Sequence, residues 1–405
     1  MDGASIIEQL TADRGIADPY PLYARAHELG AAAPAGPGTV LAIGHAAADQ
    51  VLRNPAFGPE EFERLSEMDA DLARHSSVTL LGRSILQRNG PDHTRVRSLI
   101  ASAFNARRVA ALRPAVAASA GRLLDRMAEQ GGDGSPVDFM DTFAFRLPVE
   151  VICELLGVPE PDRHRFRGLA GDLTVALELV QDLAELADAD AAADELSGYF
   201  TALVAERLAR PKDDLVSDLA RIAADAPERI SGRELLANLV LLLVAGFETT
   251  TNLLGNGLAL LFRYPQAMEG LRTGALDPAR FTDEVLRYDS PVQLTTRVAT
   301  AEGLDVAGVP TPPGTVVLVL LAAANHDPAR YHRPELFDPC RTDSRPLSFG
   351  GGSHFCLGSQ LARLEAEVAV PALLDRFLRL APGGVPTRRD RLVLRGFDTL
   401  PVTVR

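Results

Sequence analysis

The 405-residue chain has few cysteines and almost no lysine. Its three cysteines, Cys153, Cys340 and Cys356, lie far apart, and this small odd number argues against a disulfide framework and for a reducing compartment. Lys212 is the only lysine, so nearly all of the basic charge is arginine. The formal net charge of -13 disfavours nucleic acid and anionic membranes as partners.

The chain also lacks an N-terminal hydrophobic run, an internal repeat and a low-complexity linker. Its first ten residues carry Asp2 and Glu8, which fits neither a signal peptide nor a membrane anchor. Hydrophobic residues make up 46% of the sequence, enough for a large buried core. We therefore expect a cytoplasmic protein that does not associate with membranes.

One glycine-rich stretch, residues 349–358, reads FGGGSHFCLG. Cys356 lies directly before a helical pattern that begins near Leu357, and a helix N-terminus favours a thiolate. The glycines permit tight turns, and the two phenylalanines offer an apolar wall for a metal–sulfur bond. Taken alone, the stretch also suits a glycine-rich turn with a buried structural cysteine, or a cysteine hydrolase.

A second stretch predicts one long apolar helix from Ser231 to Phe262, in which Ser231 and Glu234 have capping-box spacing. At about 1.5 Å per residue it spans roughly 48 Å, which exceeds the ~30 Å core of a bilayer. Its internal polar residues, and the absence of flanking basic clusters, favour a helix buried in a soluble protein over a membrane span.

Residues 245–250 of this helix read AGFETT. Ala245 and Gly246 remove side-chain bulk, so a flat ligand can approach the backbone. Glu248 and Thr249 add an acid and a hydroxyl that can hold water and deliver protons. The alternative for this segment is a packing notch of small residues beside a buried acid.

Further candidate residues are cationic or paired. His93 and Arg97 share one face of a predicted helix, and two such donors suit a carboxylate. Glu284 and Arg287 have the i,i+3 spacing of a helical ion pair, and Arg297 ends an extended segment. Each of these is also typical of an ordinary surface residue.

Taken in order, these motifs resemble those of the cytochrome P450 family, the haem-thiolate monooxygenases. The resemblance covers nearly the whole chain. It implies a single domain over residues 1–405 with the cytochrome P450 fold, mainly α with a small β-rich region. It implies haem b as cofactor and the Cys356 thiolate as its iron ligand. The other residues implied to hold the haem are His93, Arg97, Ala245, Gly246, Arg297, Phe349, Gly350, His354 and Gly358.

The implied reaction inserts one oxygen atom of O₂ into an apolar small molecule, by hydroxylation or epoxidation. Glu248 and Thr249 would manage protons, and Glu284 with Arg287 would be a structural pair. Val292, Leu294 and Phe397 would contact the substrate. By analogy with soluble bacterial members we expect a secondary metabolite such as a polyketide, peptide or terpenoid.

The resemblance also implies partners and an oligomeric state. A ferredoxin and its reductase would supply electrons to a monomer. The ferredoxin would dock near basic residues on the cysteine side, which are Arg95, Arg107, Arg108 and Arg363.

Three other functions remain open from the sequence. A peroxide-using haem-thiolate enzyme needs no proton-delivery alcohol, so Glu248 and Thr249 argue against it. A non-catalytic haem-binding sensor is disfavoured because no output domain is attached. A haem-free carrier of apolar ligands is the third.

Two features near the C-terminus, Leu336 and Pro371, depart from the family pattern. Leu336 stands where the family has an arginine that joins Glu284 and Arg287, and Arg341 or His332 could replace it. Pro371 is expected to kink or break the helix after the cysteine loop. Residues 391–405 predict paired strands around a turn at residues 396–398.

Overall fold

The computed structural model describes residues 2–180, 182–342 and 344–404, and it is mainly helical. The α-helices are α1 (Gly3–Leu10), α2 (Asp13–Ala17), α3 (Tyr20–His27), α4 (His45–Arg53), α5 (Phe62–Met68), α6 (Ser76–Gly82), α7 (Gly90–Ala101), α8 (Ala106–Ala111), α9 (Arg113–Gln130), α10 (Arg146–Leu156), α11 (Phe166–Leu173), α12 (Ala187–Ala209), α13 (Leu215–Asp225), α14 (Gly232–Arg263), α15 (Pro265–Arg272), α16 (Pro278–Tyr288), α17 (Leu321–Ala324) and α18 (Ser359–Arg376). The strands are β1 (Ala32–Pro34), β2 (Thr39–Ala42), β3 (Phe57–Gly58), β4 (Val137–Asp138), β5 (Thr295–Ala299), β6 (Asp305–Val306), β7 (Val309–Pro310), β8 (Val316–Val319), β9 (Ala381–Pro382), β10 (Thr387–Arg388), β11 (Phe397–Thr399) and β12 (Pro401–Thr403). The fold class predicted from the sequence, mainly α with a small β-rich region, is confirmed.

Contacts between residues group the chain into two compact units. The first contains Met1–Gly58, Val116–Ala144 and Thr249–Arg405, and the second contains Pro59–Ala115 and Phe145–Glu248. We describe each unit by itself, and a single domain over residues 1–405 stays a prediction.

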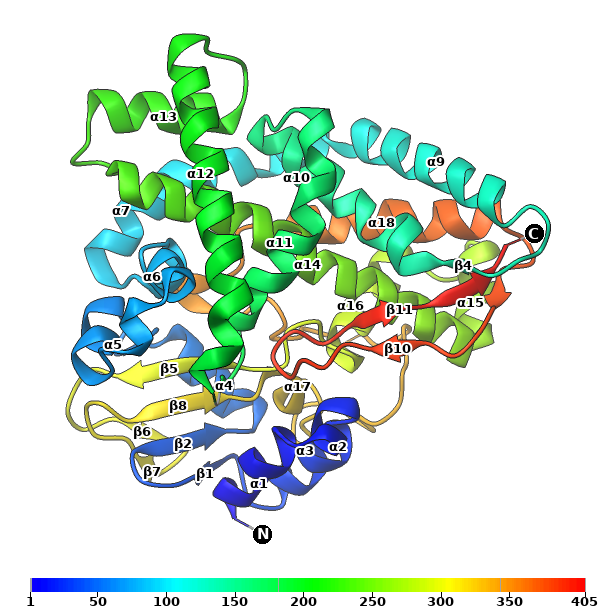
Figure 1. Cartoon of the computed structure of the whole chain (residues 1–405). Coiled ribbons are helices and arrows are strands. Elements are labelled where there is room, and N and C mark those ends of the chain that lie inside the picture. Colours follow the sequence, from blue (N-terminus) through cyan, green and yellow to red (C-terminus); the bar gives the residue numbers. More distant parts are fainter. Residues whose placement is uncertain (1, 181, 343, 405) are drawn as a thin grey trace. The chain divides into compact units, whose positions relative to one another are not determined.

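The first unit contains a five-stranded sheet with strand order β1-β2-β8-β5-β3. In Figure 1 it joins blue N-terminal strands to yellow strands from the later part of the chain. The apolar strand β8 lies between β2, its parallel partner, and β5, its antiparallel partner, so Val317 is fully buried. In this register Arg297 of β5 pairs with Val317, which places an arginine inside the sheet.

Helix α18 of the first unit runs unbroken from Ser359 to Arg376 with Pro371 inside it. Of the kink or break that we expected at Pro371, the break does not occur. Proline removes one backbone hydrogen bond, but the side chains around it, Ala369, Val370, Leu373 and Leu374, are all buried and hold the helix by packing.

The C-terminal strands of the first unit pair differently from the prediction. Residues 397–399 form β11 instead of a turn, and β11 pairs with β10, which lies earlier in the chain. Strand β12 pairs with β4 and β9. The loop between β10 and β11 therefore comprises residues 389–396.

The second unit is helical. Helices α11 and α12 pack together, and the ring centroids of Phe166 and Tyr199 are 5.1 Å apart in an edge-on contact. Short 3₁₀ turns lie between these two helices. Cys153 on α10 is fully buried, and burial raises the pKa of its thiol to about 12, as expected for a core cysteine.

Helix α14 begins with the predicted capping box. The Ser231 N–H donates to Glu234 Oε2 at 2.8 Å, and Ser231 Oγ accepts from the Glu234 N–H at 3.3 Å. Among the described residues α14 is the one helix long and apolar enough to cross a membrane, yet 72% of its most apolar window is buried inside the protein. Core helices of soluble proteins share this property.

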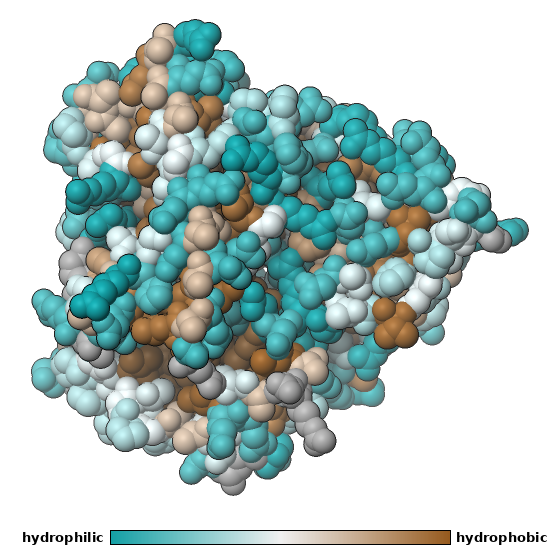
Figure 2. Space-filling view, in the orientation of Figure 1, coloured by the Kyte–Doolittle hydropathy of each residue, from teal (hydrophilic) through white to brown (hydrophobic). Residues whose placement is uncertain are grey.

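The surface carries few large hydrophobic side chains. On the face drawn in Figure 2 most residues are hydrophilic, and hydrophobic residues show mainly in hollows between them. The exposed large hydrophobic residues in the described part of the chain are Leu86, Leu208, Leu336, Phe355, Leu378 and Val385. Phe355 is the member of this set that lies in the cysteine loop.

Candidate active site

The cysteine loop is held at its base by a buried polar network. Ser348 Oγ donates to the carbonyl of Leu286 on α16 at 2.6 Å, and Asn325 Oδ1 accepts from the Leu347 N–H at 2.7 Å. Both bonds lie directly before Phe349 in the chain. These two hydrogen bonds therefore fix the start of the loop within the first unit.

Within the loop the backbone turns back on itself. The Cys356 N–H donates to the Phe349 carbonyl at 2.9 Å, and Gly350 and Gly352 adopt φ of +70° and +64°, which glycine allows without strain. The centroids of Phe349 and Phe355 are 6.4 Å apart. The loop thus forms a tight turn with two rings beside one thiol.

The Cys356 thiol is exposed, and it lies three residues before Ser359, the first residue of α18. A Cβ added at Gly358 would lie 4.0 Å from the sulfur, so glycine keeps the space near the thiol open. The helix N-terminus favours a thiolate here. By contrast Cys340 is exposed without a glycine loop around it, and in the described chain no three metal-ligating side chains gather elsewhere.

Arg297 is a buried cation without an anion. Its side chain is 7% exposed, and its NH1 donates to Thr295 Oγ1 at 3.2 Å and to the Thr296 carbonyl at 2.7 Å. Burial lowers the pKa of its guanidinium to about 10. No carboxylate of the described residues lies within salt-bridge distance of it, so the first unit presents an unbalanced positive charge.

Helix α7 of the second unit carries two further residues that can be cationic, His93 and Arg97. His93 is 2% exposed, and burial, followed by the charge of Arg97, lowers the pKa of its imidazole. His93 and Arg97 are four residues apart on α7, so they lie on the same side of this helix. Two such donors suit an anionic group.

The middle of helix α14 is buried except for a short stripe. Ala245 is exposed, and Gly246 and Thr249 are half-buried. Phe247 and Glu248, which lie between Gly246 and Thr249 in the chain, are buried. A Cβ added at Gly246 would lie 2.6 Å from Ile152 of α10, so glycine is required for this packing. Ala245 and Thr249 are four residues apart and share the accessible face.

Glu284 and Arg287 form a bidentate ion pair inside the first unit, with N–O distances of 2.7 and 2.9 Å. The two side chains are 1% and 0% exposed. Arg287 also donates to the carbonyls of Asn325, Pro334 and Leu336 at 3.0, 2.9 and 2.8 Å. This pairing agrees with the predicted structural role.

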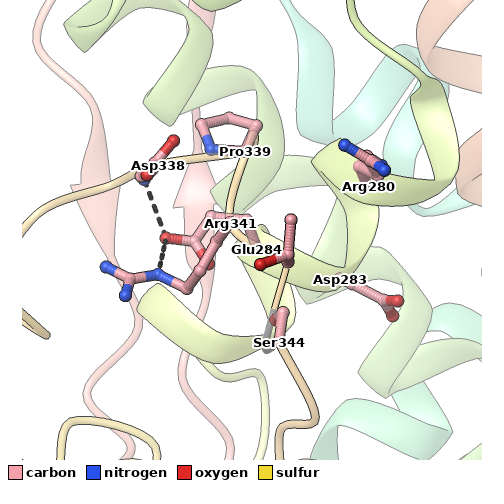
Figure 3. A pocket seen from close by; sticks show the side chains of 8 residues that line it. Arg280, Asp283, Glu284, Asp338, Pro339, Arg341 and Ser344 are labelled. Carbon is pink, nitrogen blue, oxygen red and sulfur yellow. Dashed lines mark hydrogen bonds and ion pairs between the residues drawn. The ribbon is translucent and has the colours of Figure 1, made fainter. Parts of the chain in front are cut away.

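Arg341 takes the place of the arginine that is missing at Leu336. Its Nε lies 3.7 Å from Glu284 Oε1, and the Asp338 N–H donates to the same oxygen at 2.8 Å (Figure 3). Arg341 also donates to the carbonyl of His332, so His332 contributes only backbone. The sequence left both residues open, and the structure selects Arg341.

The three predicted substrate contacts lie in the first unit. Val292 is half-buried and forms an isolated antiparallel bridge with Leu394, while Leu294 and Phe397 are buried. The ring of Phe397 lies below the guanidinium of Arg388, 3.8 Å from its centroid. Val292 is thus the most accessible of the three.

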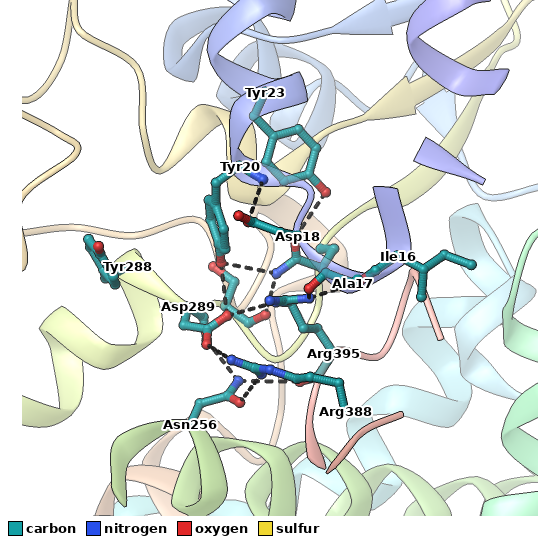
Figure 4. Close-up of polar contacts among 12 residues, drawn as sticks. Ile16, Ala17, Asp18, Tyr20, Tyr23, Asn256, Tyr288, Asp289, Arg388 and Arg395 are labelled. Atoms are coloured by element: carbon teal, nitrogen blue, oxygen red, sulfur yellow. Dashed lines mark hydrogen bonds and ion pairs between the residues drawn. The ribbon is translucent and has the colours of Figure 1, made fainter. Parts of the chain in front are cut away.

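The sequence analysis missed a buried ionic cluster next to these residues. Asp289, directly after α16, accepts from Arg388 at 2.9 Å, from Arg395 at 3.0 Å and from the Tyr20 hydroxyl at 3.0 Å (Figure 4). Burial opposes charge on Asp289, but the two guanidiniums outweigh it and lower the pKa of the carboxyl to about 2. Its partners are distant in sequence, and no local spacing could have indicated them.

The arginines predicted to attract a ferredoxin differ in their surroundings. Arg107 and Arg108 on α8 are exposed, whereas Arg95 donates to Glu234 at 2.7 Å. Arg363 on α18 pairs with Asp283 at 2.9 Å and lies 4.5 Å from the centroid of Phe349. Arg107 and Arg108 thus offer the least compensated positive charge of the four.

The residues present fit a haem group. An exposed thiol before a helix, a buried arginine without an anion and an open stripe of small residues on a buried helix match a flat, dianionic macrocycle with a thiolate-bound metal. Each of these three features meets one requirement of the cofactor.

Comparison with known proteins agrees with this geometry. The family model described as Cytochrome P450 matches residues 280–398. The chain is 38% identical over 400 residues to the cytochrome P450 monooxygenase PikC of Streptomyces venezuelae, covering 96% of this chain and 92% of that protein. It is 41% identical over 316 residues to the 6-deoxyerythronolide B hydroxylase of Saccharopolyspora erythraea, covering 77% of this chain and 76% of that protein.

Solved structures show the same likeness. Mycobacterium smegmatis CYP164A2 with econazole bound has a TM-score of 0.87 and 34% identity, covering 99% of this chain and 100% of that one. A haem-thiolate cofactor follows from the family. The chain therefore belongs to the cytochrome P450 family and is a cytochrome P450 monooxygenase.

Proposed function

We propose that this chain binds haem b through Cys356 and hydroxylates or epoxidises a bulky apolar secondary metabolite. The exposed thiol at the start of α18 carries the proposal, because it is the one soft ligand in the described chain that a helix N-terminus favours as thiolate. When bound, the haem supplies oxygen activation, and electron donation by the thiolate favours O–O cleavage.

Several residues would hold the cofactor. The unbalanced charge of Arg297 supports a role in binding a haem propionate, together with His354 of the cysteine loop. His93 and Arg97 on α7 would bind a propionate in the same way. Phe349, Gly350 and Gly358 would enclose the thiolate and exclude water, while Ala245 and Gly246 would let the ring approach α14.

Thr249 and Glu248 would handle protons. The half-buried Thr249 hydroxyl lies on the accessible stripe of α14, where it can hold a water molecule. The neighbouring Glu248 carboxyl is 1% exposed and can give a proton to that water. Protonation by such a pair suits O₂ as oxidant better than peroxide.

The names of the relatives support the substrate class. One relative is named for hydroxylation of 6-deoxyerythronolide B, and a fold neighbour, the monooxygenase TamI, holds tirandamycin C in its structure. Val292 and Leu294, with Phe397 beside them, would give an apolar wall for a ligand of this kind. A polyketide, peptide or terpenoid is the proposed substrate.

The remaining assignments concern cellular context. A ferredoxin and its reductase would deliver electrons to a monomeric, cytoplasmic enzyme, with Arg107 and Arg108 among the docking cations. Turnover that depends on ferredoxin, and fails with hydrogen peroxide alone, is expected. Efficient turnover with peroxide would favour the peroxide-using alternative.

The decisive experiment is a reduced, carbon-monoxide difference spectrum of the purified protein and of two serine variants. We expect a Soret band at the thiolate position in the wild type and in Cys340→Ser, and its loss in Cys356→Ser. Cys340 is a matched control because it is also exposed. A band that survives in Cys356→Ser would contradict the proposal.

A further inference from the structure

Two extended segments of the first unit lie side by side next to α16. The Gln293 N–H donates to the Val393 carbonyl and the Arg395 N–H donates to the Pro291 carbonyl, each at 2.9 Å. Between these bonds Val292 forms its bridge with Leu394. We call this pairing of residues 291–293 with residues 393–395 the 292/394 bridge.

The bridge is short, and β-bridges of this length are weak by themselves. Two backbone hydrogen bonds between loop segments do not define one register, because each could re-form after a small slip. Something beyond the bridge must therefore fix how Val292 and Leu394 face one another.

Asp289 supplies that constraint from the residue after α16. One carboxylate oxygen accepts from Arg388 Nη2, at the start of the loop, and the other accepts from Arg395 Nε, at its end. A single side chain therefore binds both ends of the segment that supplies Leu394 (Figure 4). Asp289 is the one carboxylate of the described residues that accepts from both Arg388 and Arg395.

The clamp is also tied to rigid elements. Asn256 of α14 accepts from Arg388 at 2.8 Å through Oδ1, and its Nδ2 donates to the carbonyls of Asp289 and Arg395 at 3.0 and 3.3 Å. Arg395 donates to the carbonyls of Ile16 and Ala17 at 3.0 and 3.1 Å. Helices α14 and α16 and the N-terminal segment thus meet at one carboxylate.

The arrangement depends on charge. Asp289 is 5% exposed and Arg395 is 6% exposed, so their attraction is little screened by solvent. The lowered pKa of Asp289 agrees with a carboxylate that stays ionised between two guanidiniums. A neutral amide at this position would leave the buried Arg395 and the partly exposed Arg388 with a weaker acceptor.

We propose that Asp289 is a positioning residue that sets the ligand specificity of this enzyme, by holding Arg388 and Arg395 and so fixing the 292/394 bridge. The inference rests on the proposed function, in which Val292 lines the substrate side. A small ligand that does not reach the bridge is insensitive to this clamp, whereas a bulky one is sensitive.

The test uses two azoles that differ in size, imidazole and econazole, titrated into the haem-loaded protein and followed by the Soret shift. Arg388→Met is the main variant, because Arg388 is 27% exposed and its loss perturbs the fold less than loss of Asp289. Asp289→Asn is the second variant. Arg391→Met is the control, since Arg391 lies in the same loop and donates to the neighbouring Asp390 carbonyl at 3.3 Å.

We expect the Kd of econazole to rise about tenfold in Arg388→Met, a change of about 1.4 kcal/mol, and by more in Asp289→Asn. The Kd of imidazole should stay within about twofold in both variants, and Arg391→Met should change neither ligand. An equal rise for both azoles, or none for econazole, would overturn the inference while the carbon-monoxide band remains normal. A wild-type protein without that band would overturn the proposed function and this inference together.

Discussion

Two buried arginines in the first unit, Arg287 and Arg297, have opposite surroundings. Arg287 is 0% exposed, and it donates hydrogen bonds to the carboxylate of Glu284 and to three backbone carbonyls. Arg297 is 7% exposed and has one hydroxyl and one carbonyl as acceptors, and no carboxylate of residues 2–180, 182–342 and 344–404 lies within salt-bridge distance.

The difference separates a structural charge from a charge kept for a ligand. A buried ion that is paired within the protein adds to fold specificity, and removing one partner leaves the other unpaired at high cost. A buried ion without a protein partner destabilises the protein until an external anion arrives. The first unit therefore contains both kinds of cation. Four measurements can test whether Arg287 and Arg297 differ in this way.

The largest effect is expected from breaking the Arg287 pair. Glu284→Gln removes the charge but keeps the shape, and it should lower the free energy of unfolding by about 3–5 kcal/mol, because Arg287 becomes an uncompensated buried cation. Urea unfolding followed by circular dichroism measures this. Glu335→Gln is the control, since Glu335 is exposed and its distance to Arg333 is 3.9 Å. A loss below about 1 kcal/mol would place Glu284 with surface pairs.

The second prediction concerns His326, which lies against the Arg287 cluster. Burial, followed by the charge of Arg287, lowers the pKa of His326 to about 4, and its Nε2 is 2.9 Å from the Tyr288 carbonyl. In the unfolded chain His326 therefore binds a proton near pH 6.5, whereas in the folded protein it binds one only near pH 4. Stability should fall by up to about 3 kcal/mol as pH drops through this window.

His326→Gln should flatten that dependence, measured as urea midpoints between pH 7 and pH 4. The exposed His164 is the control, and His164→Gln should leave the slope unchanged. A slope that persists in His326→Gln would assign the effect to other groups.

A smaller effect is expected at Arg341. Its Nε is 3.7 Å from Glu284, longer than the 2.7 Å contact of Arg287, so Arg341→Gln should cost about 2 kcal/mol at most. Differential scanning calorimetry of this variant beside Glu284→Gln tests the ranking. A loss equal to that of Glu284→Gln would mean that Arg341 is as important as Arg287.

The smallest effect in unfolding, and the most diagnostic one, is expected at Arg297. Arg297→Met should leave the stability of the haem-free protein unchanged or slightly raised, because a desolvated cation is removed. Haem transfer to an acceptor globin should be about tenfold faster, equal to about 1.4 kcal/mol of lost cofactor binding. Arg297→Lys keeps the charge without the planar fork and should fall between the two. Unchanged haem release in Arg297→Met would remove its assignment to a propionate.

Local patterns in the sequence predicted much of the fold. The long helix predicted from Ser231 is present as α14, and the Ser231–Glu234 cap forms as its spacing indicated. Such features are determined within a few residues, where capping and periodicity act. The cysteine loop was recognisable for the same reason.

Long-range polar contacts were not predictable in this way. Arg341 completes the Glu284 cluster from a loop of irregular conformation, and His332 was an equal candidate on sequence grounds. Asp289 reads as the residue that ends α16, and nothing near it indicates that two arginines from the C-terminal loop converge on it. The error at Pro371 has a similar origin, because tertiary packing outweighed a local preference.

The cysteine loop also determines when during synthesis this enzyme can take up its cofactor. A Cβ at Gly352 would lie against the carbonyl of Leu52 on α4, so the loop is seated on a helix from the first quarter of the chain while it belongs itself to the last quarter. Contacts between such distant segments form late in folding. On the ribosome, α4 is synthesised well before the cysteine loop that contacts it. We therefore expect haem to bind only after the C-terminal quarter has been translated, because the thiolate is not held against α4 before then.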